Sequence, residues 1–191
     1  KKLEKINVKN YESIINEKDL EKWINILSNQ SIICVDTETS SLNPIDTDLV
    51  GVSFSYEPNK ACYIPIAHKN IKGLKKDLVL KKIKPVLEDP SIKKVGQNIK
   101  FDYIVLKQNG ISIESLEDTM LISYTLDAGL NRHGLDTISE IHLDHKTISY
   151  KDLVGSGKKK LNFSDIDLKK ATEYAAEDAD VTLRLYNFLK N

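Results

Sequence analysis

Two carboxylates follow the first apolar run of the chain. Residues 32–35 are Ile-Ile-Cys-Val, which is typical of a buried β-strand, and they lead directly into Asp36, Thr37 and Glu38. Because side chains alternate between the two faces of a strand, Asp36 and Glu38 point to the same side. An isolated pair of this kind is equally compatible with a solvated strand end. The pair therefore indicates a chemical site only if further acids join it.

A third carboxylate is predicted on the buried face of the last helix. At about 100° per residue, the apolar side chains of residues 168–189 gather into one stripe, and Asp178 falls near its middle. An ionised carboxylate there costs several kcal/mol unless a cation or hydrogen-bond donors compensate it. Tyr174, one turn earlier, shares that face, whereas Glu177 and Asp180 point away from it and are expected to be solvated. The alternative is a core tyrosine, with Asp178 satisfied by backbone donors or a lysine.

The middle helix repeats this spacing. Asn98 and Asp102 are four residues apart, and Asp102 lies toward the apolar side of a helix expected over about residues 98–108. Asn98 fits either a helix cap or a second polar group beside Asp102.

Together the three segments supply four acids: Asp36, Glu38, Asp102 and Asp178. If they face one cavity, they repel one another and raise one another's pKa unless multivalent cations lie between them. Oxygen-only ligands select hard cations, Mg²⁺ or Mn²⁺. Two such ions about 4 Å apart serve in-line displacement at phosphorus, where one activates water and the other stabilises the leaving oxygen. The acids therefore predict phosphodiester hydrolysis.

The elements that must position these acids form an α/β pattern with a mixed sheet. Four short β-type runs are expected, at residues 31–37, 49–55, 61–66 and 92–95. Asn16 is expected to cap a first helix, and a lysine-rich helix ends near residue 89. From Asp118, expected to cap the next helix, the chain is mostly helical, and its last helix begins near Asp167.

The composition is that of an ordinary globular protein. The 191 residues are 40% hydrophobic and 29% charged, and no apolar stretch approaches the roughly 20 residues of a membrane helix. Because 28 basic and 28 acidic residues give zero net charge, any nucleic-acid contact must be local. Cys34 and Cys62 lie in apolar runs without paired spacing, so we expect both in the core. With no secretory signal visible, a cytoplasmic location is expected.

Three segments resemble the signature motifs of the 3′→5′ proofreading exonuclease domain of bacterial family-A DNA polymerase I. They are Asp36-Thr37-Glu38, Gln97-Asn98-Ile99-Lys100-Phe101-Asp102 and Tyr174-Ala175-Ala176-Glu177-Asp178-Ala179-Asp180. The likeness covers essentially the whole chain from about residue 10. It implies an RNase H-like (DnaQ-like) fold, with a mixed five-stranded sheet flanked by helices. It also implies a single exonuclease domain over residues 1–191, in which residues 1–10 are a linker.

The resemblance assigns roles to individual residues. Two divalent ions, Mg²⁺ or Mn²⁺, would be held by Asp36, Glu38, Asp102 and Asp178. Tyr174 would orient the attacking water, since a phenol with an ordinary pKa of about 10 is a poor general base. The residues implied to hold the DNA 3′ end are Leu42, Gln97, Asn98, Phe101 and Arg132. Phe101 stands where the family more usually has Tyr, which puts a hydroxyl contact in doubt, and Leu42 and Phe101 also fit a loop anchor and a core residue.

The function implied is proofreading: hydrolysis at single-stranded or frayed DNA 3′ ends, releasing nucleoside 5′-monophosphates. The domain would be monomeric, with no membrane partner and a place close to the nucleoid. It would be a fragment that stops where the polymerase domain of the same polypeptide begins. Two alternatives stay open, an RNA-trimming exonuclease of the RNase D kind with the same acids and a catalytically silent module that supports the polymerase. The lysine run at residues 158–160 fits either a solvated loop or a contact with a DNA phosphate.

Overall fold

A computed structural model describes residues 5–157 and 160–190 of the chain. The strands are β1 (Glu12–Ser13), β2 (Ile32–Thr39), β3 (Leu49–Glu57), β4 (Lys60–Pro65), β5 (Lys93–Gly96) and β6 (Leu116–Asp118). The helices are α1 (Glu17–Ser28), α2 (Lys76–Leu87), α3 (Lys100–Gln108), α4 (Thr119–Asp127), α5 (Leu135–Leu143), α6 (Tyr150–Val154) and α7 (Leu168–Leu189). Short 3-10 turns lie at Val8–Asn10 and Phe163–Asp165.

The six strands form one mixed sheet in the order β1-β4-β3-β2-β5-β6. Strands β2, β3 and β4 are an antiparallel meander, and the remaining pairings are parallel. The mixed α/β fold predicted from the sequence is confirmed, but the sheet has six strands rather than five. The four runs expected from the sequence pattern are β2, β3, β4 and β5, whereas the edge strands β1 and β6 are too short to give an alternating pattern.

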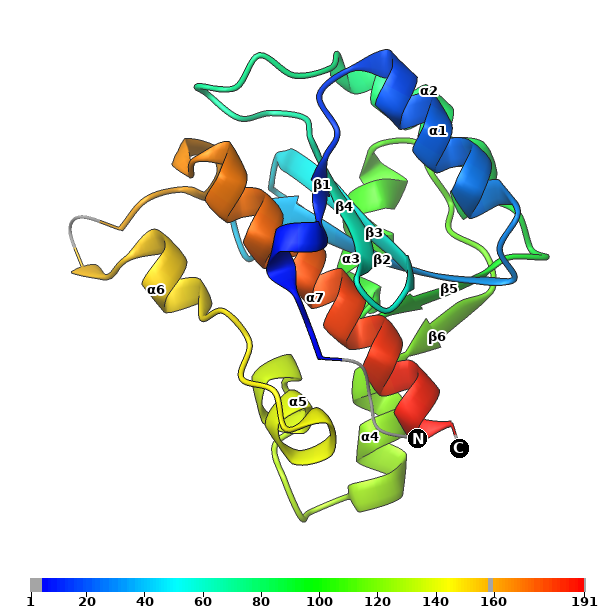
Figure 1. Cartoon of the computed structure of the whole chain (residues 1–191), viewed down its shortest axis with the longest axis vertical. Helices are drawn as coiled ribbons and strands as arrows, with labels where there is room; N and C mark the ends of the chain where they lie inside the picture. The colour runs from blue at the N-terminus through cyan, green and yellow to red at the C-terminus, as the bar shows by residue number, and fades with distance from the viewer. Residues whose placement is uncertain (1–4, 158–159, 191) are drawn as a thin grey trace.

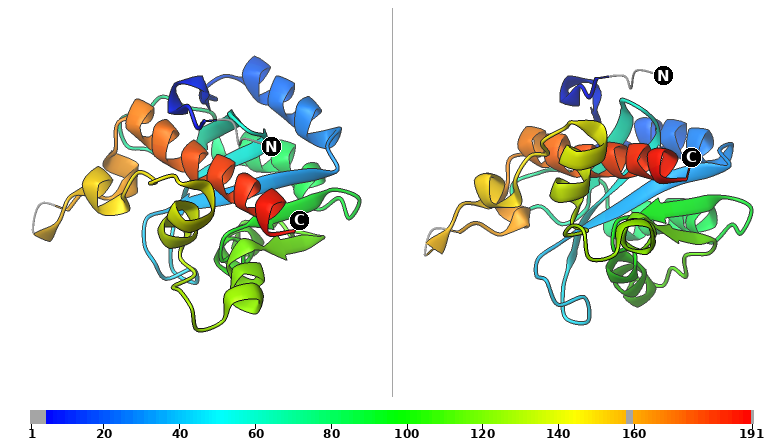
Figure 2. Two further views of the ribbon diagram at one scale, coloured as in Figure 1. Left: turned by 60° about the horizontal axis from the view of Figure 1, so that its bottom comes forward. Right: turned by 90° about the horizontal axis from the view of Figure 1, so that it is seen from below.

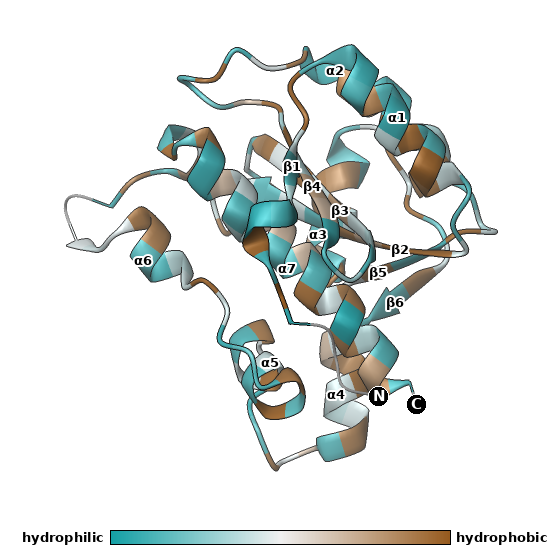
Figure 3. Cartoon of the chain, in the orientation of Figure 1, coloured by the Kyte–Doolittle hydropathy of each residue, from teal (hydrophilic) through white to brown (hydrophobic). Residues whose placement is uncertain are grey.

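Helices cover both faces of the sheet. In Figure 1 α7 crosses in front of the sheet and α3 lies behind it, and the right-hand view of Figure 2 separates these layers. Ile33 and Val35 of β2 join a core with α1, α2 and α3, whereas Cys34 packs against Ala179 and Leu183 of α7. Polar residues, teal in Figure 3, cover the outer sides of α1 and α2. The alternation of β2 thus decides which layer each of its side chains meets.

The local signals at the helix ends are mostly confirmed. The Asn16 side chain accepts a hydrogen bond from the backbone N–H of Asp19 and caps α1, and Asp118 caps α4. The cap interpretation of Asn98 is wrong: α3 begins after Ile99, and Asn98 has a left-handed φ of 56°. The Asp118 carboxylate instead accepts hydrogen bonds from the backbone N–H groups of residues 98 and 99. The acceptors at the start of α3 therefore come from a residue distant in sequence.

Two further expectations concern the core and the helices. Cys34 and Cys62 are buried and unpaired, as predicted. Among the described helices, none combines the length and the apolar character needed to cross a bilayer.

Candidate active site

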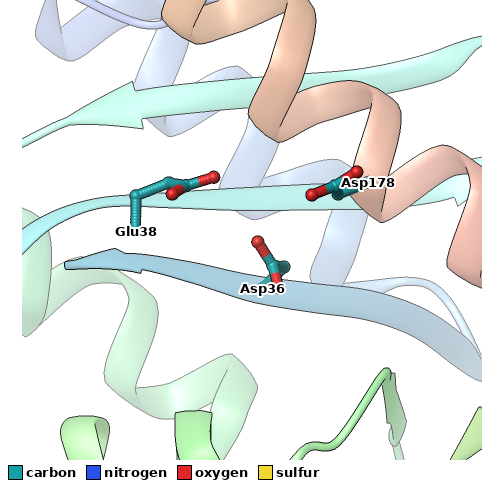
Figure 4. Close-up of side chains that lie close together, drawn as sticks. All are labelled: Asp36, Glu38 and Asp178. Atoms are coloured by element: carbon teal, nitrogen blue, oxygen red, sulfur yellow. The ribbon is translucent and has the colours of Figure 1, made fainter. Parts of the chain in front are cut away.

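Strand β2 and helix α7 bring three of the predicted acids together. Cys34, Asp36 and Glu38 alternate onto the face of β2 that α7 covers, and Cys34 contacts the small Ala179 side chain, which lets the helix lie close to the sheet. One carboxylate oxygen from each of Asp36, Glu38 and Asp178 lies within 4.8 Å of the other two. Figure 4 shows the three side chains turned toward one another.

Asp102 reaches this region from the opposite face of the sheet. It is buried on α3, and its Oδ1 accepts hydrogen bonds from the Thr37 backbone N–H at 2.8 Å and the Thr37 hydroxyl at 2.6 Å. Thr37 lies between Asp36 and Glu38 and points the other way. Three of the four predicted acids, Asp36, Glu38 and Asp178, therefore form one cluster. The fourth, Asp102, is hydrogen-bonded to Thr37.

Asp36, Glu38 and Asp178 line a cleft of about 620 Å³, and Asp102 is not among its lining residues. The β2 end and the loop after it form one wall, with Leu42 at its rim. The other lining residues include Phe101, Tyr150, Lys160, Leu161, Asn162 and Tyr174. The cleft therefore combines an acidic floor with apolar and aromatic walls.

Burial and mutual repulsion dominate the electrostatics of the floor. Burial raises the pKa of Asp36 well above its usual range, and the charges of Asp102 and Asp178 raise it further. Burial raises the pKa of Glu38, and the charges of Asp36, Asp178 and Asp102 raise it further. Burial followed by the charge of Glu177 raises the pKa of Asp178, against the opposing effect of a hydrogen bond with Tyr174. Burial raises the pKa of Asp102 to about 7, against the opposing effect of its Thr37 hydrogen bonds. Four raised carboxyl pKa values in one place mark a site that lacks positive charge.

The donor set fits hard divalent cations. Glu38 is 7% exposed, and its buried Oε1 has no hydrogen-bond partner within the described chain. Among the described residues, no lysine, arginine or histidine forms an ion pair with Asp36, Glu38 or Asp178. Converging carboxylate oxygens with an orphaned acceptor are the ligands that Mg²⁺ and Mn²⁺ prefer.

Tyr174 lies in an aromatic cluster beside the acids. Its ring centroid is 6.0 Å from those of Tyr150 and Phe163. Burial, followed by the charge of Asp178, raises the pKa of its hydroxyl above the ordinary value of 10. The hydroxyl therefore stays protonated at neutral pH and can donate a hydrogen bond, but it cannot act as a general base.

The solvated positions predicted for Glu177 and Asp180 are wrong. Glu177 is 2% exposed, and its carboxylate binds His145 Nε2 at 2.9 Å and the Ile148 backbone N–H at 2.6 Å. Asp180 is fully buried and pairs with Arg184 Nε at 2.9 Å. A single apolar stripe assumes that one side of a helix is covered, whereas α7 also contacts α4, α5 and the segment at residues 8–10.

Asp180 has two further donors from distant segments. The Tyr11 hydroxyl donates to its Oδ2 at 2.8 Å, and the Asn59 backbone N–H donates to the same atom at 3.1 Å. Because every one of these partners is internal, Asp180 belongs to the scaffold rather than to the cleft.

The residues predicted to hold a DNA end divide into two groups. Leu42, 85% exposed, and Phe101, half-buried, line the cleft. Gln97, Asn98 and Arg132 are not among its lining residues. The Gln97 amide donates to the His133 carbonyl and accepts from the Thr119 hydroxyl, and Asn98 and Arg132 are exposed.

The sequence reasoning missed the roles of Tyr150 and Thr37. Tyr150 contributes an aromatic wall beside Tyr174, and it lies outside the three signature segments of the sequence. Thr37 binds Asp102 from within the first acidic motif, a contact that only the packing of α3 reveals.

Comparisons with known proteins agree along nearly the whole chain. A family profile described as a 3′-5′ exonuclease matches residues 11–191. The DNA polymerase I of Rhizobium leguminosarum is 44% identical over 194 residues, covering 90% of this chain and 19% of that protein. The DNA polymerase I of Pseudomonas aeruginosa is 40% identical over 185 residues, covering 94% of this chain and 20% of that protein. The chain thus spans about a fifth of the length of these relatives.

Solved structures share the fold. Trypanosoma brucei RNase D matches with a TM-score of 0.75 at 19% identity, covering 94% of this chain and 64% of that one. Brucella melitensis NrnC with bound Mg²⁺ matches with a TM-score of 0.64 at 26% identity, covering 94% of this chain and 78% of that one. The sheet and its flanking helices are those of the DnaQ-like exonucleases.

Proposed function

The chain belongs to the 3′-5′ exonuclease family of bacterial DNA polymerase I, and from this premise we propose that it hydrolyses phosphodiester bonds at single-stranded or frayed DNA 3′ ends. The products are nucleoside 5′-monophosphates, and the biological task is proofreading. The observation that carries the proposal is the convergence of Asp36, Glu38 and Asp178 within 4.8 Å on the floor of an open cleft.

The acids are proposed to hold two divalent ions, Mg²⁺ or Mn²⁺. Asp36, Glu38 and Asp178 supply converging oxygens, and Asp102 adds a fourth carboxylate behind them. The Mg²⁺ bound in the related NrnC structure supports this choice of metal. When bound, such ions supply a nucleophile from water at neutral pH and neutralise charge on the leaving oxygen. The Thr37 hydrogen bonds hold Asp102 in place while the site is loaded.

Tyr174 is proposed to position the attacking water. Its hydroxyl remains protonated because burial and Asp178 raise its pKa, so it donates a hydrogen bond and leaves a water oxygen lone pair directed at phosphorus. The neighbouring rings of Tyr150 and Phe163 limit the rotation of the phenol. Tyr174 therefore acts by orientation, and bound ions would lower the pKa of the attacking water so that its proton can pass to solvent.

The walls of the cleft are proposed to hold the terminal bases. Leu42 and Phe101 line it together with Tyr150, and stacking on such side chains contributes about 1–3 kcal/mol per base without regard to sequence. A cleft of this kind accepts bases only after they leave a duplex, so mispaired ends that fray readily are preferred. The exposed Asn98 and Arg132 remain predicted contacts of the strand, and Gln97 is proposed to hold the His133 carbonyl beside Arg132.

The domain is proposed to work beside a polymerase domain of the same polypeptide. The relatives are DNA polymerases in which the matching region makes up 19–20% of the chain. A 3′ end released from a polymerase site would then reach this cleft without leaving the protein.

A degradation assay tests the proposal. We expect 5′-labelled single-stranded DNA to shorten from its 3′ end in Mg²⁺ or Mn²⁺ and to remain intact in EDTA. The same sequence made as RNA should be degraded more slowly. Faster degradation of the RNA would instead favour the RNA-trimming alternative.

A thermal melt separates an active site from a silent module. A ligand that binds only the folded state raises stability by about 2.7 kcal/mol at one hundred times its Kd. We expect Mn²⁺ to raise the Tm of the wild-type chain, and the double substitution Asp36→Asn with Glu38→Gln to remove that shift. The absence of any shift, together with the absence of nuclease activity in Mn²⁺, would support the silent module.

A further inference from the structure

One cation lines the acidic cleft in the described part of the chain. Lys160 is exposed and faces the same cleft as Asp36, Glu38 and Asp178. Among the described residues it forms no ion pair with a carboxylate. Its ammonium nitrogen instead lies 5.5 Å from the centroid of the Tyr150 ring. A lysine that lines the same cleft as three acids and forms no ion pair with them has its charge available for another partner.

Hydrogen bonds tie the segment around Lys160 to α6 and to the loop that follows β2. The Lys160 N–H donates to the Gly157 carbonyl at 3.2 Å, and the next residue, Leu161, donates to Val154 of α6 at 2.8 Å. The Asn162 side chain donates to the Ser40 carbonyl at 2.8 Å, in the loop that follows β2. These bonds hold the base of the lysine side chain at the wall of the cleft, and the residue is exposed to solvent. Lys158 and Lys159, the other two lysines of the run, lie outside the described residues.

The chemistry of a nucleic-acid strand supplies the missing partner. Every phosphate carries a negative charge, and an acidic floor repels all of them except the one bound through divalent ions. A lysine ammonium is a compact charge with three donors and no fixed geometry, which suits a phosphate oxygen whose position varies with sequence. The contact with the Tyr150 ring is weak at an exposed site, so the ammonium can leave it for a phosphate.

We propose that Lys160 binds a backbone phosphate of the substrate strand on the 5′ side of the scissile bond. This inference rests on the proposed function, since in a site that takes the 3′-terminal nucleotide every other phosphate of the strand lies on the 5′ side. Lys160 thereby offsets the repulsion of the acids for the part of the strand that the divalent ions do not reach. It acts in substrate binding and takes no part in bond cleavage.

Two substrates test this role. A single-stranded DNA oligonucleotide carries phosphates upstream of the scissile bond, whereas thymidine 5′-(p-nitrophenyl phosphate) carries only the scissile phosphate. For Lys160→Gln we expect a several-fold higher KM on the oligonucleotide with kcat unchanged, and unchanged hydrolysis of the small ester. The slope of log(kcat/KM) against log salt should fall by about 0.7, the value for one phosphate contact on a single strand.

Matched variants complete the experiment. Lys160→Arg keeps the charge and should retain most of the affinity, and Lys151→Gln, an exposed lysine of α6 outside the cleft lining, should leave KM and the salt slope unchanged. Equal losses on both substrates, an unchanged oligonucleotide KM, or an unchanged salt slope would overturn the proposal.

A binding measurement keeps this proposal separate from the proposed function. Fluorescence anisotropy of a labelled oligonucleotide is measured with Asp36→Asn protein, with and without Lys160→Gln. Weaker binding by the double variant supports the phosphate contact even if the wild type proves inactive, and equal binding refutes it. Inactivity of the wild type in the degradation assay would count against the proposed function alone.

Discussion

Glu177 and Asp180 of helix α7 are enclosed by hydrogen-bond donors, whereas Asp178, between them in sequence, faces other carboxylates. Glu177 binds His145 and the Ile148 backbone, and Asp180 binds Arg184. Asp178 instead shares the cleft floor with Asp36. Carboxylates within one turn of one helix therefore serve the scaffold at two positions and the site at the third.

The difference lies in where each charge finds its compensation. A buried carboxylate with internal donors keeps its charge without help from outside the protein. The three acids of the cleft have no internal cation, so their charge must be compensated by protons or by ions from solution. The scaffold acids and the cleft acids therefore differ in how their charge is compensated, and not in their burial or residue type.

The largest expected effect is on activity, for Asp178→Ala. If Asp178 is a metal ligand as proposed, its loss removes several kcal/mol of transition-state stabilisation, or about a thousandfold in rate. The free energy of unfolding in EDTA should stay level or rise, because a repelled charge is removed. Oligonucleotide degradation and urea unfolding measure the two quantities. A loss of several kcal/mol of stability in EDTA would show that Asp178 is part of the scaffold after all.

Asp180→Ala should have the opposite effect, a large loss of stability with little loss of activity. Removing one partner of a buried ion pair costs about 3–5 kcal/mol, since the Arg184 guanidinium remains buried. Urea unfolding monitored by circular dichroism measures the loss, and activity per folded molecule should be retained in Mg²⁺. Tyr11→Phe, which removes only one donor to Asp180, is the milder control, with an expected loss of about 1.5–3 kcal/mol. A fully stable but inactive Asp180→Ala protein would show that Asp180 belongs to the site and not to the scaffold.

The pH dependence of stability in EDTA should show the same contrast. The cleft acids have raised pKa values, that of Asp102 moving from 3.8 to about 7, so the folded state binds protons more tightly than the unfolded chain. Their contribution to stability is therefore complete below about pH 4 and is lost as the pH rises toward 7.

The measurement is the free energy of unfolding across this pH range. The free energy of unfolding of the wild type minus that of Asp36→Asn isolates the contribution of the cleft. We expect the wild type to lose stability relative to the variant as the pH rises. Saturating Mn²⁺ should reverse the trend, because the ion requires deprotonated ligands. A difference that grows in favour of the wild type in EDTA would mean that an internal cation compensates the acids.

Tyr174→Phe is expected to have the smallest effect. It removes the hydroxyl that is proposed to orient water and leaves the ring contacts with Tyr150 and Phe163 intact. A lost hydrogen bond of about 1–1.5 kcal/mol corresponds to roughly a tenfold slower single-turnover rate, with stability nearly unchanged. A variant that keeps full activity would remove the water-positioning role.

Local patterns account for the parts of the fold and site that were predictable. The alternation along residues 32–38 fixed which face of β2 carries Asp36 and Glu38, and the apolar stripe of the last helix directed Asp178 toward the sheet. The Asn16 and Asp118 caps follow equally from short-range chemistry. The edge strands β1 and β6 were missed because two or three residues carry no periodicity.

The sequence by itself determined the order of the main elements and the side of each on which the four predicted site acids lie, because both follow from the geometry of consecutive residues. Only the tertiary structure decided which acids are compensated. Glu177 and Asp180 depend on His145 and Tyr11, which come from segments far away in the chain, and Asp102 approaches from the opposite face of the sheet. A carboxylate becomes part of a scaffold or of a reactive site according to its neighbours in space, and those neighbours are set by packing.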